Sequence, residues 1–257
     1  MPEETIVELP TGTIRLLSGG SGPPLMLLHH DIDGAVWGEF HELLAGRFHV
    51  FAPDLPGWGG STRLEWARHP RDLAAVILAL GRALELRPYV LAGLGFGGWV
   101  AAEMASFAPD DLRRLILIGA AGLKPDTTHI LDQVMMDYRD YVGAGFAESS
   151  TFVRTYGETI SPEQRARWET SREVIARISW KPYMYSYELP ETLKAVHTPA
   201  AIIWGTHDSV VPPRCAALYA EALPNATTEL VTGGGHFLDL EHPGQLASMI
   251  AKACEEQ

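Results

Sequence analysis

The sequence has few cysteines, no long apolar run and no basic segment at its start. It contains two cysteines among 257 residues, Cys215 and Cys254, too few to indicate a disulfide scaffold or a zinc site made of thiolates. No segment has the roughly 20 uninterrupted apolar residues of a membrane helix. Residues 1–10 are acidic and lack the basic beginning of a signal peptide. We therefore expect a reduced, cytoplasmic protein.

Positive charge is also scarce. The chain has 20 Lys and Arg against 32 Asp and Glu, which gives a net charge of −12, and no run of basic residues offsets it. Such a charge would repel a phosphate backbone or an anionic membrane. We expect neither nucleic acid nor a membrane as a partner. A small-molecule substrate or ligand is expected, and the composition is compatible with a homodimer.

Hydrophobic residues make up 46% of the chain, enough for a sizeable core. After a predicted hairpin over residues 4–18, short apolar runs typical of buried strands alternate with helical patterns. The predicted strands are residues 24–28, 48–52, 89–92, 112–118, 200–204 and 227–231. The predicted helices are residues 35–44, 72–86, 97–107, 213–223 and a last one from residue 243. This order predicts an α/β fold, a mainly parallel eight-stranded sheet with helices on both faces.

The alternation is interrupted between residues 125 and 188, where helical patterns and aromatic residues occur without a convincing strand. We interpret residues 1–124 and 189–257 as the core and residues 125–188 as an inserted helical cap, or lid. Most of its aromatic residues should pack. The dense run over residues 180–187 is interpreted as facing a pocket for a mid-sized apolar or aromatic substrate. The candidate pocket residues are His30, Trp37, Tyr138, Tyr183 and Phe237.

A strand–turn–helix stretch over residues 89–99 carries the strongest motif. Gly93, Gly95 and Gly97 have the spacing of a nucleophile elbow, glycine–x–nucleophile–x–glycine, in which the chain turns sharply between a strand and a helix. The outer glycines are expected because the chain passes too close to its neighbours for a Cβ atom.

Together with three further segments, this stretch resembles the α/β-hydrolase fold superfamily over essentially the whole chain. The segments are residues 54–59, 204–212 and 233–237, and they follow the order of that family. The resemblance implies Asp208 as the acidic member and His236 as the histidine of a catalytic triad. It also implies that backbone N–H groups of Phe96 and Asp31 form an oxyanion hole.

The residue at the nucleophile position is Gly95, which has no side chain to attack a carbonyl or to form an acyl-enzyme. Asp208 and His236 are still suited to general-base catalysis. We expect the missing side chain to leave space for a water molecule, so that His236 activates this water or takes a proton directly from the substrate.

The residues after the strand at 24–28 also depart from the family. His30 replaces the glycine of a His-Gly pair, and Asp31 follows it. The Asp31 carboxylate is interpreted either as a proton acceptor in the cleft or as an outward-facing cap of the next helix. A metal site made of His29, His30, Asp31 and Asp33 lacks a recognised ligand spacing, so we predict no metal and no cofactor.

The glycines also permit a second interpretation. Gly93, Gly95 and Gly98 have the spacing of a dinucleotide-binding loop. That loop requires an acidic residue at the end of the following strand, about 20 residues on, whereas Gly119 ends this strand. We consider the dinucleotide interpretation the weaker one.

These features predict a hydrolase or a mechanistically related lyase that uses a His236–Asp208 base on a small, partly apolar carbonyl compound without a serine intermediate. Two alternatives stay open. The protein is a ligand-binding homologue without catalysis, or it is a serine hydrolase inactivated by a Ser-to-Gly replacement.

Overall fold

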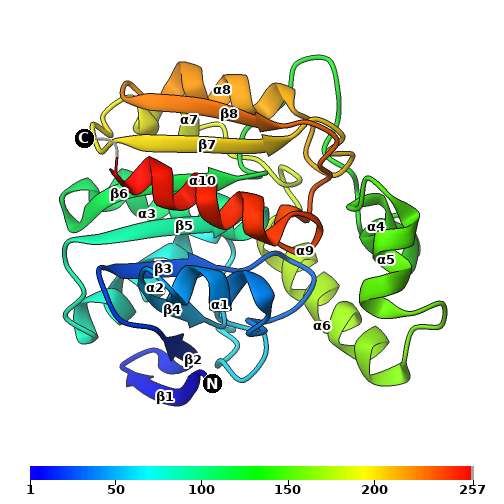
Figure 1. Ribbon diagram of the computed structural model, residues 1–257, viewed down its shortest axis with the longest axis horizontal. Helices are drawn as coiled ribbons and strands as arrows, with labels where there is room; N and C mark the ends of the chain where they lie inside the picture. The colour runs from blue at the N-terminus through cyan, green and yellow to red at the C-terminus, as the bar shows by residue number, and fades with distance from the viewer. Residues whose placement is uncertain (256–257) are drawn as a thin grey trace.

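The computed structural model describes residues 1–255 and contains an eight-stranded sheet in the order β1-β2-β4-β3-β5-β6-β7-β8 (Figure 1). The pairs β1–β2 and β2–β4 are antiparallel, and the other neighbours are parallel. The strands are β1 (Glu3–Leu9), β2 (Gly12–Gly19), β3 (Pro24–Leu28), β4 (His49–Pro53), β5 (Tyr89–Leu94), β6 (Leu112–Ile118), β7 (Ala200–Gly205) and β8 (Ala226–Val231). The predicted mainly parallel eight-stranded sheet is confirmed.

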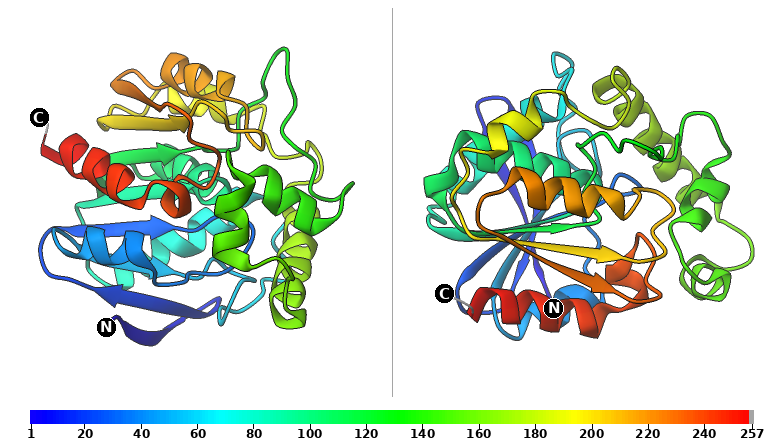
Figure 2. Two further views of the ribbon diagram at one scale, coloured as in Figure 1. Left: turned by 45° about the vertical axis from the view of Figure 1, so that its right-hand side comes forward. Right: turned by 90° about the horizontal axis from the view of Figure 1, so that it is seen from above.

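Helices cover both faces of this sheet, as Figure 2 shows from above. One face carries α1 (Glu39–Ala45) and α10 (Pro243–Glu255), which contact each other. The other carries α2 (Pro70–Ala83), α3 (Phe96–Phe107), α7 (Leu189–Leu193) and α8 (Arg214–Ala222). The remaining short elements are η1 (Pro109–Asp111) and α9 (Leu238–Glu241).

Strand β5 shows why the apolar runs form central strands. All six of its residues are buried. Leu91 packs with the hydrophobic cluster on the α2–α3 side, whereas Val90 and Ala92 pack with the cluster on the α1–α10 side. Because successive side chains point to opposite faces, a strand covered on both sides must be apolar at every position.

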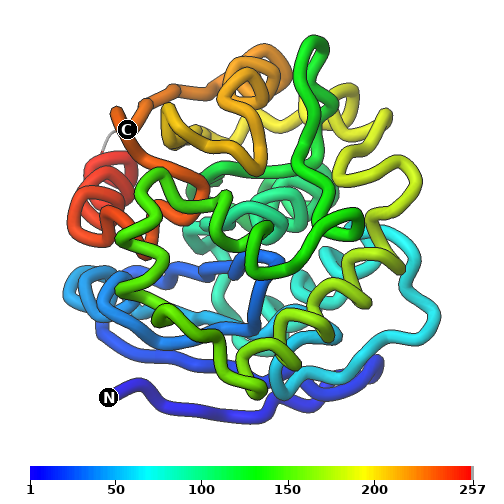
Figure 3. The backbone as a smooth tube through the Cα atoms, turned by 90° about the vertical axis from the view of Figure 1, so that its right-hand side faces the viewer, coloured from blue at the N-terminus to red at the C-terminus, as the bar shows by residue number. Residues whose placement is uncertain are grey.

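Residues 125–188 contain α4 (Tyr138–Ala144), α5 (Ser149–Tyr156) and α6 (Pro162–Ile178), and no strand of the sheet. We call them the cap segment. Figure 1 shows its helices to one side of the sheet, beyond the end toward which β7 points, and Figure 3 shows them facing the viewer. Tyr138, Tyr141 and Trp168 of this segment belong to the same hydrophobic cluster as α2 and α3. Within residues 1–255, none of the helices has the length and hydropathy that crossing a bilayer would need.

The starts of two helices differ from the prediction by two residues or more, for local reasons. The helix expected from Ala35 begins at Glu39, because the Asp54 carboxylate accepts the Ala35 N–H at 2.6 Å and holds the chain in an irregular turn. Helix α2 begins at Pro70, two residues early, because the His69 side chain accepts the Arg71 N–H and caps the helix.

Candidate active site

The predicted site residues follow the carboxyl ends of four parallel strands. His30 follows β3, Gly95 follows β5, Asp208 follows β7 and His236 follows β8. Because parallel strands end at the same edge of a sheet, residues far apart in the sequence meet there.

The elbow at Gly95 has the strained backbone that the motif predicts. Its φ of +52° and ψ of −113° lie where side-chain-bearing residues are rare, and α3 begins at the next residue. A Cβ atom at Gly93 would meet the Gly97 carbonyl oxygen, and one at Gly97 would meet the His29 carbonyl oxygen. The predicted close approach of the outer glycines is confirmed.

Asp208 and His236 form a buried hydrogen-bonded pair. His236 Nδ1 lies 2.8 Å from Asp208 Oδ2, and both side chains are almost completely buried. The backbone N–H groups of Val210 and Val211 donate to Asp208 Oδ1 at 2.9 and 2.8 Å, so the carboxylate is held from its other side. With its Nδ1 bound to a carboxylate, the imidazole offers Nε2 for chemistry.

Charge around His236 favours its protonated form. Burial by itself lowers the pKa of the imidazole, but attraction to Asp208, their hydrogen bond, and the carboxylates of Asp31 and Asp239 together raise the pKa above its ordinary value of 6.5. His236 is therefore a stronger base than a free imidazole.

Two histidine rings lie close to the position that a side chain at residue 95 would take, and the predicted water molecule stays a prediction. A Cβ atom at residue 95 would lie 2.7 Å from His30 Nδ1 and 2.8 Å from His236 Nε2. Interiors close around a missing side chain when neighbours can reach it. Here the His30 and His236 rings both lie near Gly95, and His236 Nε2 is one of the two nearest atoms to the Cβ position.

His30 is held in this position by Asp239, a residue that sequence reasoning missed. His30 Nε2 lies 2.9 Å from Asp239 Oδ1 on α9. Phe237 packs on both histidines, with ring centroids 4.9 Å from His30 and 5.2 Å from His236. The sequence could have indicated this residue, because Asp239 is a carboxylate only three positions after the expected catalytic histidine.

Asp31 does not cap a helix, so that interpretation is wrong. Its side chain is buried, and its Oδ2 accepts hydrogen bonds from the Tyr141 hydroxyl at 2.7 Å and the Gln133 amide at 2.6 Å. The Tyr138 hydroxyl donates to Gln133 Oε1 at 3.2 Å. Asp31 thus ties the loop after β3 to the cap segment.

Replacing Tyr141 by phenylalanine should destabilise the protein by about 1–3 kcal/mol, because the buried Asp31 carboxylate loses one of its two side-chain donors. Urea unfolding measures the change. The matched control is Tyr187→Phe, since Tyr187 is 64% exposed and its hydroxyl is hydrogen-bonded to the Tyr185 hydroxyl and not to a buried carboxylate. It should stay within about 0.5 kcal/mol of the wild type. Equal losses in the two variants would contradict this role of Asp31.

The Phe96 N–H lies at the start of the helix that follows the elbow. Phe96 is the first residue of α3, so its N–H has no acceptor within the helix. The helix dipole adds positive charge at this end. The oxyanion-hole roles expected of the Phe96 and Asp31 N–H groups stay predictions.

Two predicted pocket residues lie elsewhere. Trp37 packs with Leu17 and Ala52 and donates its indole N–H to Glu42. Tyr183 accepts the Gln133 N–H and donates to the Leu131 carbonyl, so its hydroxyl is used inside the cap segment. Within the run 180–187, Trp180 and Tyr187 are exposed at the surface. Aromatic density there reflects packing within the cap segment and surface exposure.

The four residues considered for a metal do not converge. His29 Nε2 accepts the Leu55 N–H at 2.9 Å, and its Nδ1 is bound to the His30 carbonyl. Asp31 faces the cap segment, and Asp33 accepts from Arg167 Nε at 3.0 Å. Burial lowers the pKa of His29, which keeps it a neutral structural group.

A cavity of about 430 Å³ adjoins the site at His30. It runs between the loop after β3 and the cap segment, where Tyr156, Gln164 and Arg167 line it, and Asp239 lines it beside His30. His30 and Leu94, the residue before Gly95, both line this cavity. A ligand in the cavity would contact the His30–Asp239 pair.

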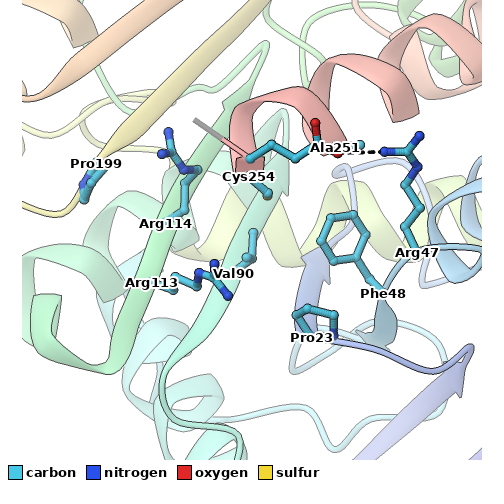
Figure 4. A pocket seen from close by; sticks show the side chains of 10 residues that line it. Pro23, Arg47, Phe48, Val90, Arg113, Arg114, Pro199, Ala251 and Cys254 are labelled. Carbon is cyan, nitrogen blue, oxygen red and sulfur yellow. Dashed lines mark hydrogen bonds and ion pairs between the residues drawn. The ribbon is translucent and has the colours of Figure 1, made fainter. Parts of the chain in front are cut away.

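A second cavity, of about 480 Å³, lies at the opposite ends of the strands (Figure 4). Its lining includes Pro23, Val90 and Pro199, which stand at or next to the first residues of β3, β5 and β7. Arg47 beside it pairs with Glu255 at 3.0 Å. Because ligands of open α/β sheets bind at the carboxyl ends of the strands, this cavity is not part of the candidate site.

Comparison with known proteins assigns the family. Residues 16–249 match the family described as "Alpha/beta hydrolase family". The chain is 28% identical to 2-hydroxymuconate semialdehyde hydrolase of Pseudomonas sp. (strain CF600), over 92% of this chain and 88% of that protein. It is 23% identical to human monoacylglycerol lipase ABHD6, over 90% of this chain and 75% of that protein.

Solved structures show the same fold. A meta-cleavage product hydrolase (CumD) from Pseudomonas fluorescens IP01 superimposes with a TM-score of 0.80 and 22% identity, covering 95% of each chain. A bacterial membrane phospholipase A superimposes with a TM-score of 0.83 and 23% identity, covering 99% of this chain and 86% of that one. The dinucleotide-binding interpretation of the glycines is therefore wrong, and the chain belongs to the alpha/beta hydrolase family.

Proposed function

We propose that this protein is an enzyme that acts on a small, partly apolar carbonyl compound with His236 as general base and without a covalent intermediate at residue 95. The observation that carries the proposal is the buried Asp208–His236 pair, 2.8 Å apart, whose free Nε2 lies against the elbow. A protein that only binds a ligand has no chemical need for this pair. Gly95 leaves proton transfer, rather than nucleophilic attack, as the chemistry of the site.

Hydrolysis by an activated water molecule and cleavage of a carbon–carbon bond are the reactions that suit such a base. The relatives support this range, since they include a hydrolase of 2-hydroxymuconate semialdehyde and a monoacylglycerol lipase. We propose 2-hydroxymuconate semialdehyde as the first compound to test, followed by activated esters. Turnover that is present in the wild type and absent in His236→Ala supports the proposal.

A ligand-binding protein without catalysis is the second candidate. The close approach of His30 to Gly95 favours it, because His30 stands where an attacking group would act. Saturable binding of the same compounds without turnover, in the wild type and in His236→Ala alike, would support this candidate. The third interpretation, an inactivated serine hydrolase, has less support because His30 crowds the position of a serine side chain.

The pH dependence of activity gives a separate test of the base. His236 acts as a base only when neutral, so kcat/KM should rise with pH through a pKa above the ordinary 6.5. Asp208→Asn removes the main group that raises this pKa. The variant should therefore lose most of its activity, and its remaining activity should rise at a lower pH. A rising limb that Asp208→Asn leaves unmoved would show that another group is the base.

A further inference from the structure

Two imidazole rings from different loops face one point above Gly95. His30 comes from the loop after β3, and His236 comes from the loop after β8. Their nearest ring nitrogens, His30 Nδ1 and His236 Nε2, lie 2.7 and 2.8 Å from the position that a Cβ atom of residue 95 would take. Glycine at residue 95 makes this convergence possible.

Each ring is held by its own carboxylate at the other nitrogen. Asp208 binds His236 at Nδ1 at 2.8 Å, and Asp239 binds His30 at Nε2 at 2.9 Å. A carboxylate bound to one ring nitrogen fixes the proton there and leaves the other nitrogen as an acceptor. In each pair one ring nitrogen is therefore left without a carboxylate. These nitrogens are Nε2 of His236 and Nδ1 of His30, and both lie near the Cβ position of residue 95.

His30 Nδ1 has no hydrogen-bond partner within the described chain, although His30 is only 5% exposed. A buried polar nitrogen without a partner is unfavourable unless a ligand or a shared proton satisfies it. The hydrogen bond from Nε2 to Asp239 holds the His30 ring in place, so its Nδ1 is available to exchange a proton.

We propose that His30, positioned by Asp239, is a second acid–base group of the site, and that it and His236 exchange protons with the same enolisable carbonyl compound. This inference rests on the proposed role of His236 as base. It adds a proton donor, which a lone base lacks, and it replaces the acyl-enzyme with transfer of protons alone.

The step balances without any further reactant. Neutral His236 removes a proton from the carbon next to the carbonyl group, and the electrons of that C–H bond form a C=C bond. Protonated His30 donates its Nδ1 proton to the carbonyl oxygen, which takes the electrons of the C=O π bond. The product is the enol, His236 is now the protonated ring and His30 the neutral one. In a compound with a further conjugated C=C bond, His236 can return its proton to the far carbon of the dienol while the O–H proton returns to His30, which would give an isomer.

Proximity makes the two rings compete for protons. Their centroids are 5.1 Å apart, and both are buried, so a positive charge on one disfavours a positive charge on the other. Other charged groups that act on them are Asp208 and Asp31 on His236, Asp239 on both rings, and His41 on Asp239. The carboxylates favour one positively charged ring in the His30–His236 pair, and repulsion between the two rings opposes a second positive charge.

Histidine ring NMR of ¹⁵N-labelled protein tests this inference without a substrate. Whenever the His30 ring is neutral, its proton should lie on Nε2, beside Asp239, and Nδ1 should be bare. In His236→Gln, the pH dependence of the His30 ring signals should differ from that in the wild type, because the neighbouring ring and its positive charge are gone. The matched control is His129→Gln, an exposed histidine of the cap segment, which should leave both titrations unchanged.

Two results would overturn the inference. One is a His30 that titrates identically with and without His236. The other is a neutral His30 whose single proton lies on Nδ1 instead of Nε2. If His236→Gln fails to fold, titration of the wild type still decides, since coupled rings respond together in two separated steps and independent rings do not.

The outcomes separate this inference from the proposed function. Independent titrations combined with an inactive His236→Ala variant would leave the general base in place and remove the role of His30. Coupled titrations combined with an active His236→Ala variant would remove the proposed function and leave a shared proton site.

Discussion

The variant His236→Ala is expected to lose kcat/KM by about 10²–10⁴-fold, the range that a general base contributes. The imidazole is the group bound to Asp208, and its Nε2 lies against Gly95. No side chain at residue 95 can take over the reaction. Catalysis that remains would come from binding and from N–H groups such as that of Phe96.

The control for this loss is His129→Ala, which removes an exposed imidazole from the cap segment. It should keep wild-type activity. Circular dichroism and urea unfolding of both variants show whether the fold is intact. Activity of folded His236→Ala within about threefold of the wild type, less than a kilocalorie per mole in transition-state stabilisation, would contradict the assigned base.

The variant Gly95→Ser is expected to be less stable than the wild type by about 2–5 kcal/mol. A side chain at φ +52° adds backbone strain, and its Cβ would lie 2.7 Å from His30 Nδ1 and 2.8 Å from His236 Nε2. Both rings are buried and bound to carboxylates, so neither moves aside freely. The variant should also fail to react with a fluorophosphonate, because the crowded serine cannot reach the geometry of a nucleophile.

A matched control uses another glycine of the chain. At Gly143, within α4, an added Cβ atom meets nothing within 4 Å, so Gly143→Ser should cost little or stabilise the helix. Adding His30→Gly to Gly95→Ser should recover part of the lost stability, because the ring that fills the space is removed. Gly95→Ser with wild-type stability, or no recovery in the double variant, would show that His30 does not occupy this position.

The sheet and the elbow were predictable because they depend on local patterns. The buried strand β5 is apolar at every position, and the sharp turn after it needs Gly93 and Gly97 where a Cβ atom would meet backbone oxygens. The strand order then brings Asp208 and His236 to one edge of the sheet. Such features can be read from the sequence because short-range sterics and strand periodicity decide them.

The neighbours of Gly95 were not predictable in the same way. Glycine at the elbow reveals that a side chain is missing, but which residue fills the space depends on the direction of the chain after β3. His30 turns toward the elbow because Asp239 on α9 binds its Nε2, a contact between residues 209 positions apart. For this reason the sequence did not predict that His30 lies beside the elbow.

The roles of the cap residues also depended on tertiary contacts. Trp180 and Tyr183 lie in a run whose composition is typical of a ligand pocket, yet one is exposed and the other binds backbone groups of the cap segment. Tyr141, in contrast, reaches Asp31 across 110 positions of the chain. Aromatic composition alone cannot distinguish packing from ligand contact.

The central proposal is that His236, paired with Asp208, catalyses a reaction in which Gly95 replaces the nucleophile and no covalent intermediate forms. The most direct measurement is turnover of 2-hydroxymuconate semialdehyde and activated esters by the wild type and Gly95→Ser, with intact-protein mass spectrometry of the same samples. We predict turnover by the wild type, no covalent adduct, and lower turnover by Gly95→Ser. Turnover by Gly95→Ser alone, accompanied by an acyl adduct on the protein, would contradict the account.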